Sequence, residues 1–316
     1  MTHSAPAPAH GEPIAVPVLP PIADAHHHLW DMRDYHVWLH ANPRVVNFVG
    51  DYEAICQDYL ATDYLADTAG LPVIASVHVQ AEFDPSNPVG ETAWLTAQAE
   101  QTGFPTGIVG FADLSDPNVA SLLEAHAAYS RFRGIRQMLN WDDVPGRSFA
   151  EHGNFMSSTQ WRKGFDLLAR MGLRFDMQIW PNQMGEAARL LAAFPDSRVA
   201  LNHTGFPIDR DPDSMRLWRD GMRALAEQPT AYVKISGLGM LDHEWTAGSI
   251  RPIVLEAIDI FGVQRAMFAS NFPVDRLYSD YPAIFNAFSE ITADFTSEER
   301  KRLFAGTAID FYDLAT

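Results

Sequence analysis

Short β-rich runs alternate with longer amphipathic segments along most of this 316-residue chain. Runs of aliphatic and β-branched residues, bounded by glycine, proline and polar clusters, predict eight strands. The predicted strands are residues 21–27, 72–80, 106–114, 132–138, 173–179, 198–203, 231–237 and 265–270. The segments between them repeat apolar residues at i, i+3 and i+4, which predicts helices. This alternation constrains the chain to a parallel α/β fold.

Two parallel α/β architectures fit such an alternation. Eight units without a composition break favour one (β/α)₈ TIM barrel, regular or distorted, over residues 21–316. The runner-up, an open doubly wound sheet, usually carries a glycine-rich phosphate loop after its first strand. Here histidines follow that strand, and "SGLGM" at 236–240 lacks the spacing of such a loop. We therefore expect a single-domain barrel, preceded by a flexible proline- and alanine-rich arm at residues 1–20.

The first predicted strand ends in three consecutive histidines, within "IADAHHHLWDM" at residues 22–32. Because side chains alternate along a strand, Asp24, His26 and His28 are expected on one face and His27 on the other. The catalytic groups of TIM barrels project from the carboxyl ends of the strands. His26 and His28 are therefore predicted to face a catalytic site, where they could converge on one metal ion or one substrate atom.

The other predicted strands also end in polar residues. These are His78 and Gln80, Arg133 and Arg136, Asp176 and Gln178, Asn202 and His203, Lys234 and Ser236, and Asn271 and Asp275. Each alone could serve the structure, but a barrel has little reason to collect so many polar ends except at a site. Long loops rich in proline and glycine, at 82–94 and 140–155, are predicted to cover that site. Nearby aromatic residues such as Trp30 and Trp38 could pack in the core or stack on a substrate.

Charge and cysteine content exclude several classes of function. The net charge of −17 at pH 7 disfavours nucleic acid as a partner. The single cysteine, Cys56, leaves neither an intrachain disulfide nor a thiolate zinc cluster, and its helix-like setting predicts a buried, inert thiol. No run of about 18 apolar residues predicts a membrane span, and the N-terminus does not resemble a secretion signal. A cytoplasmic protein is expected, and the arm leaves a homo-oligomer open.

Five motifs occur in order along the chain: "DAHHHLWD", "FDMQIWPNQM", "ALNHTGFP", "VKISGL" and "MFASNFPVD". Together they resemble the amidohydrolase-related family of TIM-barrel hydrolases, in particular its sugar-lactonase-like branch. Enzymes of that branch hydrolyse aldonolactones, a pyrone dicarboxylate lactone and related lactones. The resemblance covers nearly the whole chain from residue 22 onward, and it is much less specific for the substrate than for the family and fold.

The resemblance also implies site residues. It assigns His26 and His28 to the paired histidines of the first strand, and His203 to the histidine after the sixth strand. The family's aspartate at the eighth strand, a metal ligand or general base, corresponds here to Asn271. The histidine that metal-binding members carry after the fifth strand corresponds to Gln178. Neutral amides are poor zinc ligands, and an asparagine cannot take a proton from water as an aspartate does.

These two departures bear on the cofactor. His26, His28 and His203 could still hold one divalent metal, zinc or manganese, with water in the fourth position. Some lactonases of the family are thought to work without metal, polarising the ester carbonyl with arginines and histidines. The first expectation is therefore that no metal is required.

The expected activity is hydrolysis of a small lactone or related cyclic ester by an activated water. His26 and His28 would face the carbonyl, with Asn271 beside them. His203 is the first choice of general base, because a neutral imidazole titrates near pH 7, and Asp275 is the second. The residues predicted to bind substrate are His78, Gln80, Arg133, Arg136, Gln178 and Lys234.

Two alternatives remain open at this level. The same superfamily contains metal-dependent nonoxidative decarboxylases and a lactone isomerase, although Gln178 and Asn271 count against metal dependence. The other alternative is a catalytically inactive binding barrel, which Asn271 suggests. The retained histidines and Lys234 count against it, because a purely structural barrel would not require them.

Overall fold

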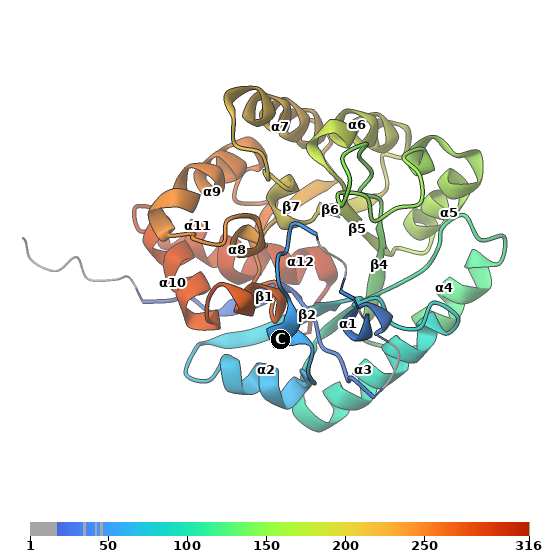
Figure 1. Ribbon diagram of the computed structural model, residues 1–316, viewed down its shortest axis with the longest axis horizontal. Coiled ribbons are helices and arrows are strands. Elements are labelled where there is room, and N and C mark those ends of the chain that lie inside the picture. The colour runs from blue at the N-terminus through green and yellow to red at the C-terminus, as the bar shows by residue number, and fades with distance from the viewer. Residues whose placement is uncertain (1–17, 34–35, 42, 45–46, 316) are drawn as a thin grey trace, which may run out of the picture.

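The structure, a computed structural model, describes residues 18–33, 36–41, 43–44 and 47–315. Within these residues eight parallel strands lie in chain order, each hydrogen-bonded to the next. The strands are β1 (Ile22–His27), β2 (Val73–Val79), β3 (Gly107–Gly110), β4 (Phe132–Met138), β5 (Arg174–Gln178), β6 (Arg198–Leu201), β7 (Ala231–Ile235) and β8 (Ala266–Phe268). Figure 1 shows the strands ringed by helices, so the predicted (β/α)₈ barrel is confirmed. Most of the predicted arm lies outside the described residues, which begin at residue 18.

Helices separate successive strands and cover the outside of the barrel. The α-helices are α1 (Val37–His40), α2 (Ala61–Asp67), α3 (Pro88–Thr102), α4 (Val119–Ala127), α5 (Thr159–Arg170), α6 (Met184–Ala193), α7 (Pro212–Ala226), α8 (Leu238–Leu241), α9 (Ala247–Phe261), α10 (Tyr281–Ile291), α11 (Ser297–Lys301) and α12 (Thr307–Tyr312). Short 3₁₀ turns are η1 (Glu53–Ile55), η2 (Phe155–Ser157), η3 (Pro181–Gln183), η4 (His203–Gly205) and η5 (Val274–Leu277), and η6 (Arg302–Gly306) is a π-helical turn. None of the helices in the described part of the chain has the length and apolarity of a membrane span.

The first of the two predicted covering loops is shorter than expected. Asn87 caps α3 by accepting a hydrogen bond from the backbone N–H of Gly90 at 3.2 Å, and Pro88 opens the helix. Proline is favoured in the first turn because its missing N–H is not needed there. Residues 88–94 are therefore helical, and the loop after β2 ends at Asn87. The second predicted loop, 140–155, is present between β4 and η2.

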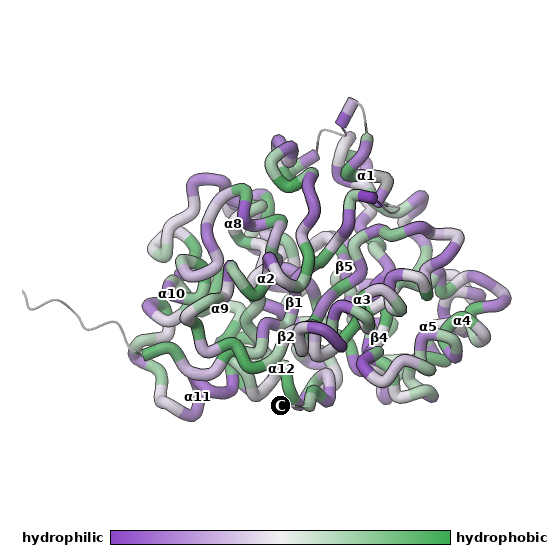
Figure 2. Tube along the Cα trace, turned by 90° about the horizontal axis from the view of Figure 1, so that it is seen from below, coloured by the Kyte–Doolittle hydropathy of each residue, from purple (hydrophilic) through white to green (hydrophobic). Residues whose placement is uncertain are grey.

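The lower end of the barrel is closed by the C-terminal helix α12. Phe311 and Tyr312 pack inside the barrel against small and β-branched residues of the strands, among them Ala25 and Val77. In Figure 2, α12 lies at the opposite end of the molecule from α1.

Arginines at the N-terminal ends of three strands bind helix α12, which plugs the lower end of the barrel. Arg133 Nε donates to the Asp313 carbonyl (3.2 Å), and Arg174 Nε donates to that of Phe311 (2.7 Å). Arg198 Nη2 donates to the carbonyl of Asp310 at 3.2 Å. Carbonyls in the last turn of a helix lack intrahelical partners and favour cations, so these bonds hold α12 in place.

The seam between β8 and β1 is closed by hydrogen bonds of the loop that follows β8. The backbone N–H of Asn271 donates to the carbonyl of His26 at 2.8 Å, and that of His28 donates to the carbonyl of Phe272 at 2.7 Å. The end of β1 and the segment after β8 are thereby fixed to each other, which completes the circle of strands.

A register shift in β1 changes which way its side chains point. The shift lies between Asp24 and His27 and breaks the alternation of side chains. Asp24 consequently contacts the outer helices: it accepts hydrogen bonds from Tyr64 (3.2 Å), Tyr281 (3.1 Å) and the backbone of Ser270 (2.9 Å). The prediction that Asp24 shares a face with the catalytic histidines is wrong for this reason.

The mouth of the barrel is partly covered by the segment between β1 and α2. We call residues 30–59 the cap segment; its two ends meet in an antiparallel bridge between Trp30 and Tyr59, with N···O distances of 2.9 and 3.0 Å. It contains α1 and η1. Cys56 follows η1 and is half-buried, whereas the sequence predicted a buried thiol.

Candidate active site

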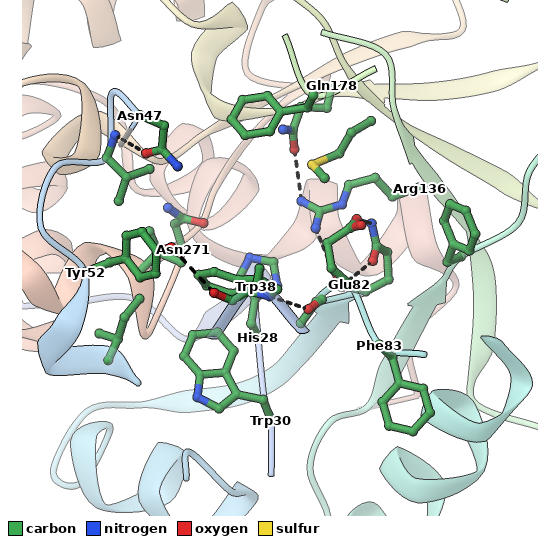
Figure 3. Close-up of a pocket in the computed structure, with 18 of the residues that line it drawn as sticks. His28, Trp30, Trp38, Asn47, Tyr52, Glu82, Phe83, Arg136, Gln178 and Asn271 are labelled. Carbon is green, nitrogen blue, oxygen red and sulfur yellow. Dashed lines mark hydrogen bonds between the residues drawn. The ribbon is translucent and has the colours of Figure 1, made fainter. Parts of the chain in front are cut away.

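A pocket of about 670 Å³ opens at the carboxyl ends of the strands. Its polar floor consists of His28, Gln80, Glu82, Arg136, Gln178, His203 and Asn271. Its upper wall is largely apolar and comes from the cap segment and the loops after β2 and β4. Figure 3 shows members of both sets around one cavity.

The predicted histidine pair lies at the floor of this pocket. His28 Nδ1 bonds the carbonyl of Val79 at 2.7 Å, and a carbonyl only accepts, so Nδ1 carries the proton and Nε2 the lone pair. His26 Nε2 lies 3.3 Å from His28 Nε2 and is thereby assigned as the donor. This assignment leaves His26 Nδ1 as an acceptor.

Lys234 supplies the donor for His26. Its Nζ lies 3.4 Å from His26 Nδ1 and forms an ion pair with Asp176, and both side chains are fully buried. Asp176 also accepts hydrogen bonds from Asn202 Nδ2 at 3.0 Å and from the hydroxyl of Tyr312 at 2.7 Å. A continuous polar network thus runs from the plug helix α12 to the histidines. Burial lowers the pKa of Lys234 to about 8, although Asp176 opposes this shift.

Arg136 and Gln178 form the second polar group of the floor. Arg136 Nη1 donates to Gln178 Oε1 at 3.0 Å, and its Nη2 donates to the carbonyl of Gln80. Since the oxygen of Gln178 is occupied, its amide N–H groups are the ones available to a ligand. A fixed guanidinium beside amide donors can bind a carbonyl oxygen or a carboxylate.

Three residues of the floor have left-handed backbone conformations. Glu82, His203 and Asn271 have φ values of 57°, 51° and 57°. Such conformations cost non-glycine residues about 1–3 kcal/mol each and often occur at functional sites. At these positions the chain leaves β2, β6 and β8.

His203 is placed to exchange protons with a bound molecule. Its Nδ1 lies 3.2 Å from Ser236 Oγ, which leaves Nε2 as the other ring nitrogen, and the residue lines the pocket. Its ring centroid is 4.5 Å from that of His26. Burial, followed by the positive charge of Arg136, lowers the pKa of His203 well below its usual range, so the imidazole is neutral at pH 7. Burial likewise lowers the pKa of His26 and of His28.

Asp275, the alternative base, does not line this pocket. Its Oδ1 accepts the backbone N–H of Met240 at 2.7 Å, and it is fully buried beside Gly239 and Trp245. Burial raises its pKa to about 7, while bonds from Met240 and the side chain of Asn271 oppose the shift. Asn271 lines the pocket, and its side chain contacts Asp275.

Two other predicted residues lie away from the pocket. His78 is buried on the outer side of β2, where Nδ1 accepts the backbone N–H of Leu29 (3.0 Å) and Nε2 lies 3.4 Å from Glu91. Arg133 lies at the opposite end of β4, where it binds α12. Neither placement supports the predicted contact with substrate. Gln80, Arg136 and Gln178 do line the floor, and Lys234 lies beneath it.

The sequence interpretation missed Glu82 and part of the cap segment. Glu82 is held by Gln80, whose side-chain amide donates to it at 2.7 Å, and burial raises its pKa. It follows Gln80 by two residues at the end of β2, and that spacing was a usable signal. Trp30 and Trp38 of the cap segment, which the sequence left between core packing and substrate stacking, do line the pocket. The contributions of Phe48, Tyr52 and Ile55 were not anticipated.

The arrangement of donors does not fit a divalent metal. The 3.3 Å between the two Nε2 atoms is near the ligand spacing of tetrahedral zinc. However, Lys234 Nζ lies 3.4 Å from His26 Nδ1, and a lysine that donates there leaves the proton of a neutral His26 on Nε2, where a metal would need the lone pair. Lys234 and Arg136 add two positive charges around the histidines. Among the described residues, no group of three or more histidine, cysteine, aspartate or glutamate side chains is arranged to hold a metal ion.

Comparison with known proteins gives consistent matches across the chain. The family model described as Amidohydrolase matches residues 23–314. The uncharacterized protein y4mH of Sinorhizobium fredii is 47% identical over 292 residues, 92% of this chain and 98% of that protein. An L-fucono-1,5-lactonase of Burkholderia multivorans is 28% identical over 311 residues, 92% of this chain and 95% of the lactonase.

A solved structure extends the likeness to three dimensions. A crystal structure of an amidohydrolase from Burkholderia multivorans with bound zinc has a TM-score of 0.78 and 25% identity. The match covers 94% of this chain and all of that chain.

Proposed function

This chain belongs to the amidohydrolase family, and on that premise we propose that it hydrolyses a small lactone or related cyclic ester. The observation that carries the proposal is the convergence of His28, His203, Arg136 and Gln178 on the floor of one pocket. This set offers neutral imidazoles to move protons and fixed donors to polarise a carbonyl. The likeness to an L-fucono-1,5-lactonase supports ester chemistry of this kind.

Ring opening begins with attack by water. His203 accepts a proton from the water as its oxygen bonds to the carbonyl carbon, which makes His203 the general base. Asn271 positions the water with its side-chain oxygen, because its amide nitrogen faces Met240 and Asp275. The role of an asparagine here is orientation, since it cannot accept the proton.

The developing oxyanion is stabilised by Arg136 and by the amide N–H groups of Gln178. Fixed donors of this kind typically lower the barrier by about 3–4 kcal/mol each. When the tetrahedral intermediate collapses, the ring C–O bond breaks and the alkoxide takes the proton held by the histidines. The product is a hydroxy acid, whose carboxylate remains opposite Arg136.

No step of this mechanism uses a metal, because the donors do not fit one. The fold relative from Burkholderia multivorans contains zinc, so the point needs a direct test. We expect activity to survive treatment with a strong chelator and subsequent dialysis. Metal analysis of active protein should show much less than one zinc or manganese per chain.

A lactone panel read with a pH indicator tests the proposed function. Five- and six-membered lactones, with and without hydroxyl groups, should acidify the medium only in the presence of protein. Release of CO₂ from an aromatic acid, together with stoichiometric metal, would point to the decarboxylase alternative. Tight binding without turnover of any ester would point to an inactive binding barrel.

The assignment of the general base makes a separate prediction. The substitution His203→Asn should lower kcat about 10²- to 10⁴-fold with a small effect on KM, as expected when a general base is removed. Asp275→Asn should lower kcat less than about 10-fold, since Asp275 does not line the pocket. The assignment fails if the two variants show the reverse order in steady-state kinetics.

A further inference from the structure

The upper wall of the pocket differs chemically from its floor. We define the apolar chamber as the space lined by Trp38, Phe48, Tyr52, Ile55, Phe83 and Phe149, above the polar floor. These residues come from the cap segment and from the loops after β2 and β4. The pocket of about 670 Å³ is within the usual range of about 300–1,000 Å³ for larger organic ligands.

Three polar atoms at the chamber are bonded to the protein itself. Trp38 Nε1 donates to the carbonyl of Ala81 at 2.9 Å, and the hydroxyl of Tyr52 donates to the carbonyl of Trp38 at 3.5 Å. Asn47, at the edge of the chamber, uses its side-chain oxygen to accept the backbone N–H of Val49 at 2.8 Å. The rings therefore present mainly carbon surface to a bound molecule.

The rings support one another in fixed orientations. Trp38 is edge-on to Trp30 with centroids 5.6 Å apart, and Phe48 is edge-on to Phe149 at 5.8 Å. Trp30 is itself fixed, because its Nε1 donates to the carbonyl of Gln57 at 2.7 Å. Edge-to-face pairs of this kind favour a preformed aromatic surface.

We propose that the substrate is a lactone whose ring carries an apolar group, aryl or alkyl, that enters this chamber while the ester lies on the floor. This inference rests on the proposed function and specifies its substrate class. Hydroxyl groups of a sugar lactone would lose water against the chamber and gain few partners, because its rings present carbon surface and the N–H of Trp38 and hydroxyl of Tyr52 are already bonded. An apolar group gains from burial there, and such contacts change kcat/KM by about 10- to 200-fold.

The test compares three six-membered lactones that share the reacting ring. They are δ-phenyl-δ-valerolactone, unsubstituted δ-valerolactone and L-fucono-1,5-lactone. We expect kcat/KM for the phenyl compound to exceed that of each of the others by at least about 10-fold. A higher kcat/KM for the hydroxylated lactone would overturn the inference and leave the proposed function standing.

Variants in the loop after β4 test whether the preference for the phenyl lactone arises in the chamber. Phe149→Ala should lower kcat/KM for the phenyl lactone about 10-fold and leave that for δ-valerolactone within about 2-fold. Val144→Ala is the matched control, since Val144 is exposed in the same loop and does not line the pocket. Phe149 is 38% exposed, so its replacement should preserve folding, which circular dichroism checks. Equal losses for both lactones in Phe149→Ala would contradict the inference.

Binding measurements distinguish a failure of this inference from a failure of the proposed function. If no lactone is hydrolysed, the proposed function fails. Tryptophan fluorescence titration then tests whether the chamber binds an apolar group. Tighter binding of the phenyl lactone than of L-fucono-1,5-lactone, weakened by Phe149→Ala, would support the chamber as an apolar site. Equal or absent binding of both compounds would overturn it.

Discussion

Arg133 and Arg136 lie on one strand but serve opposite ends of the barrel. Arg136 lies on the floor of the pocket, whereas Arg133 binds the carbonyl of Asp313 beneath it. Arg136→Ala should lower kcat/KM at least about 100-fold, because a donor to the oxyanion is lost. Arg133→Ala, the matched control, should keep wild-type kinetics and lower Tm by a few degrees. Equal kinetic losses in both variants would contradict this division.

The sequence contained part of this answer. Position along the strand separates the two arginines, because Arg133 lies near the N-terminal end of β4 and Arg136 lies nearer its carboxyl end. Alternation misled in β1, where the register shift turns Asp24 outward while His26 still faces inward. A bulge of this kind depends on pairing with the neighbouring strand, which a single sequence does not reveal.

Asp275 should make stability depend on pH. Its folded pKa of about 7 lies above the value of 3.8 for a free aspartate side chain, so the folded state binds an extra proton between these values. The stability from this group is complete below about pH 4 and is lost as the pH rises to 7. The stability advantage of wild type over Asp275→Asn should therefore shrink by roughly 1 kcal/mol per pH unit over this window.

Urea denaturation of wild type and Asp275→Asn at several pH values measures this difference. The comparison cancels the contributions of the other titrating groups. A difference that stays constant, or one that grows with pH, would show that the carboxyl group is not buried as described.

At the scale of single elements, α12 connects the end of the barrel to the catalytic histidines. Tyr312 donates a hydrogen bond to Asp176, which in turn pairs with Lys234. Tyr312→Phe leaves a buried acceptor with one partner fewer and should reduce the free energy of unfolding by about 1–3 kcal/mol. Tyr232→Phe, on a half-buried tyrosine that contacts Phe311, should change it by less than about 0.5 kcal/mol.

Equilibrium unfolding in urea, followed by circular dichroism, measures both variants. The same loss in both would show that the Tyr312 hydroxyl contributes nothing specific. The hydrogen bond between α12 and the network beneath the floor would then not contribute to the free energy of unfolding.

The strands were predictable as elements, whereas the cover of the site was not. All eight predicted strands are present because hydrophobic runs and turn residues act locally. The cap segment owes its position to contacts distant in sequence, such as the bond from Trp38 Nε1 to the carbonyl of Ala81. The histidines at the end of β1 could be predicted for the site from fold position alone, whereas the wall opposite them could not.

At the scale of the whole molecule, charges from several strands converge beneath the pocket. Because burial keeps the histidines neutral, lowering the pH from 7 to about 6 should leave kcat/KM nearly unchanged. Above about pH 8, Lys234 loses a proton and with it the positive charge that pairs with Asp176 and strengthens its hydrogen bond to His26. We therefore expect kcat/KM to decline above about pH 8.

The matched variant is Lys234→Met, which keeps the length of the side chain without the charge. It should be less active than wild type and show no decline near pH 8, after subtraction of spontaneous lactone hydrolysis. A wild-type profile that stays flat well above pH 8, or the same decline in Lys234→Met, would exclude Lys234 as its source.

The bridge between Trp30 and Tyr59 has a consequence for how such proteins diverge. It brings the two ends of the cap segment together, so the chain leaves the barrel and returns to it at neighbouring residues. Changes of length or sequence between these residues can accumulate without altering the strands that carry the histidines. The cap segment is therefore suited to exchange as one unit, and grafting residues 30–59 from a relative would change the wall of the pocket while the catalytic histidines stay on their strands.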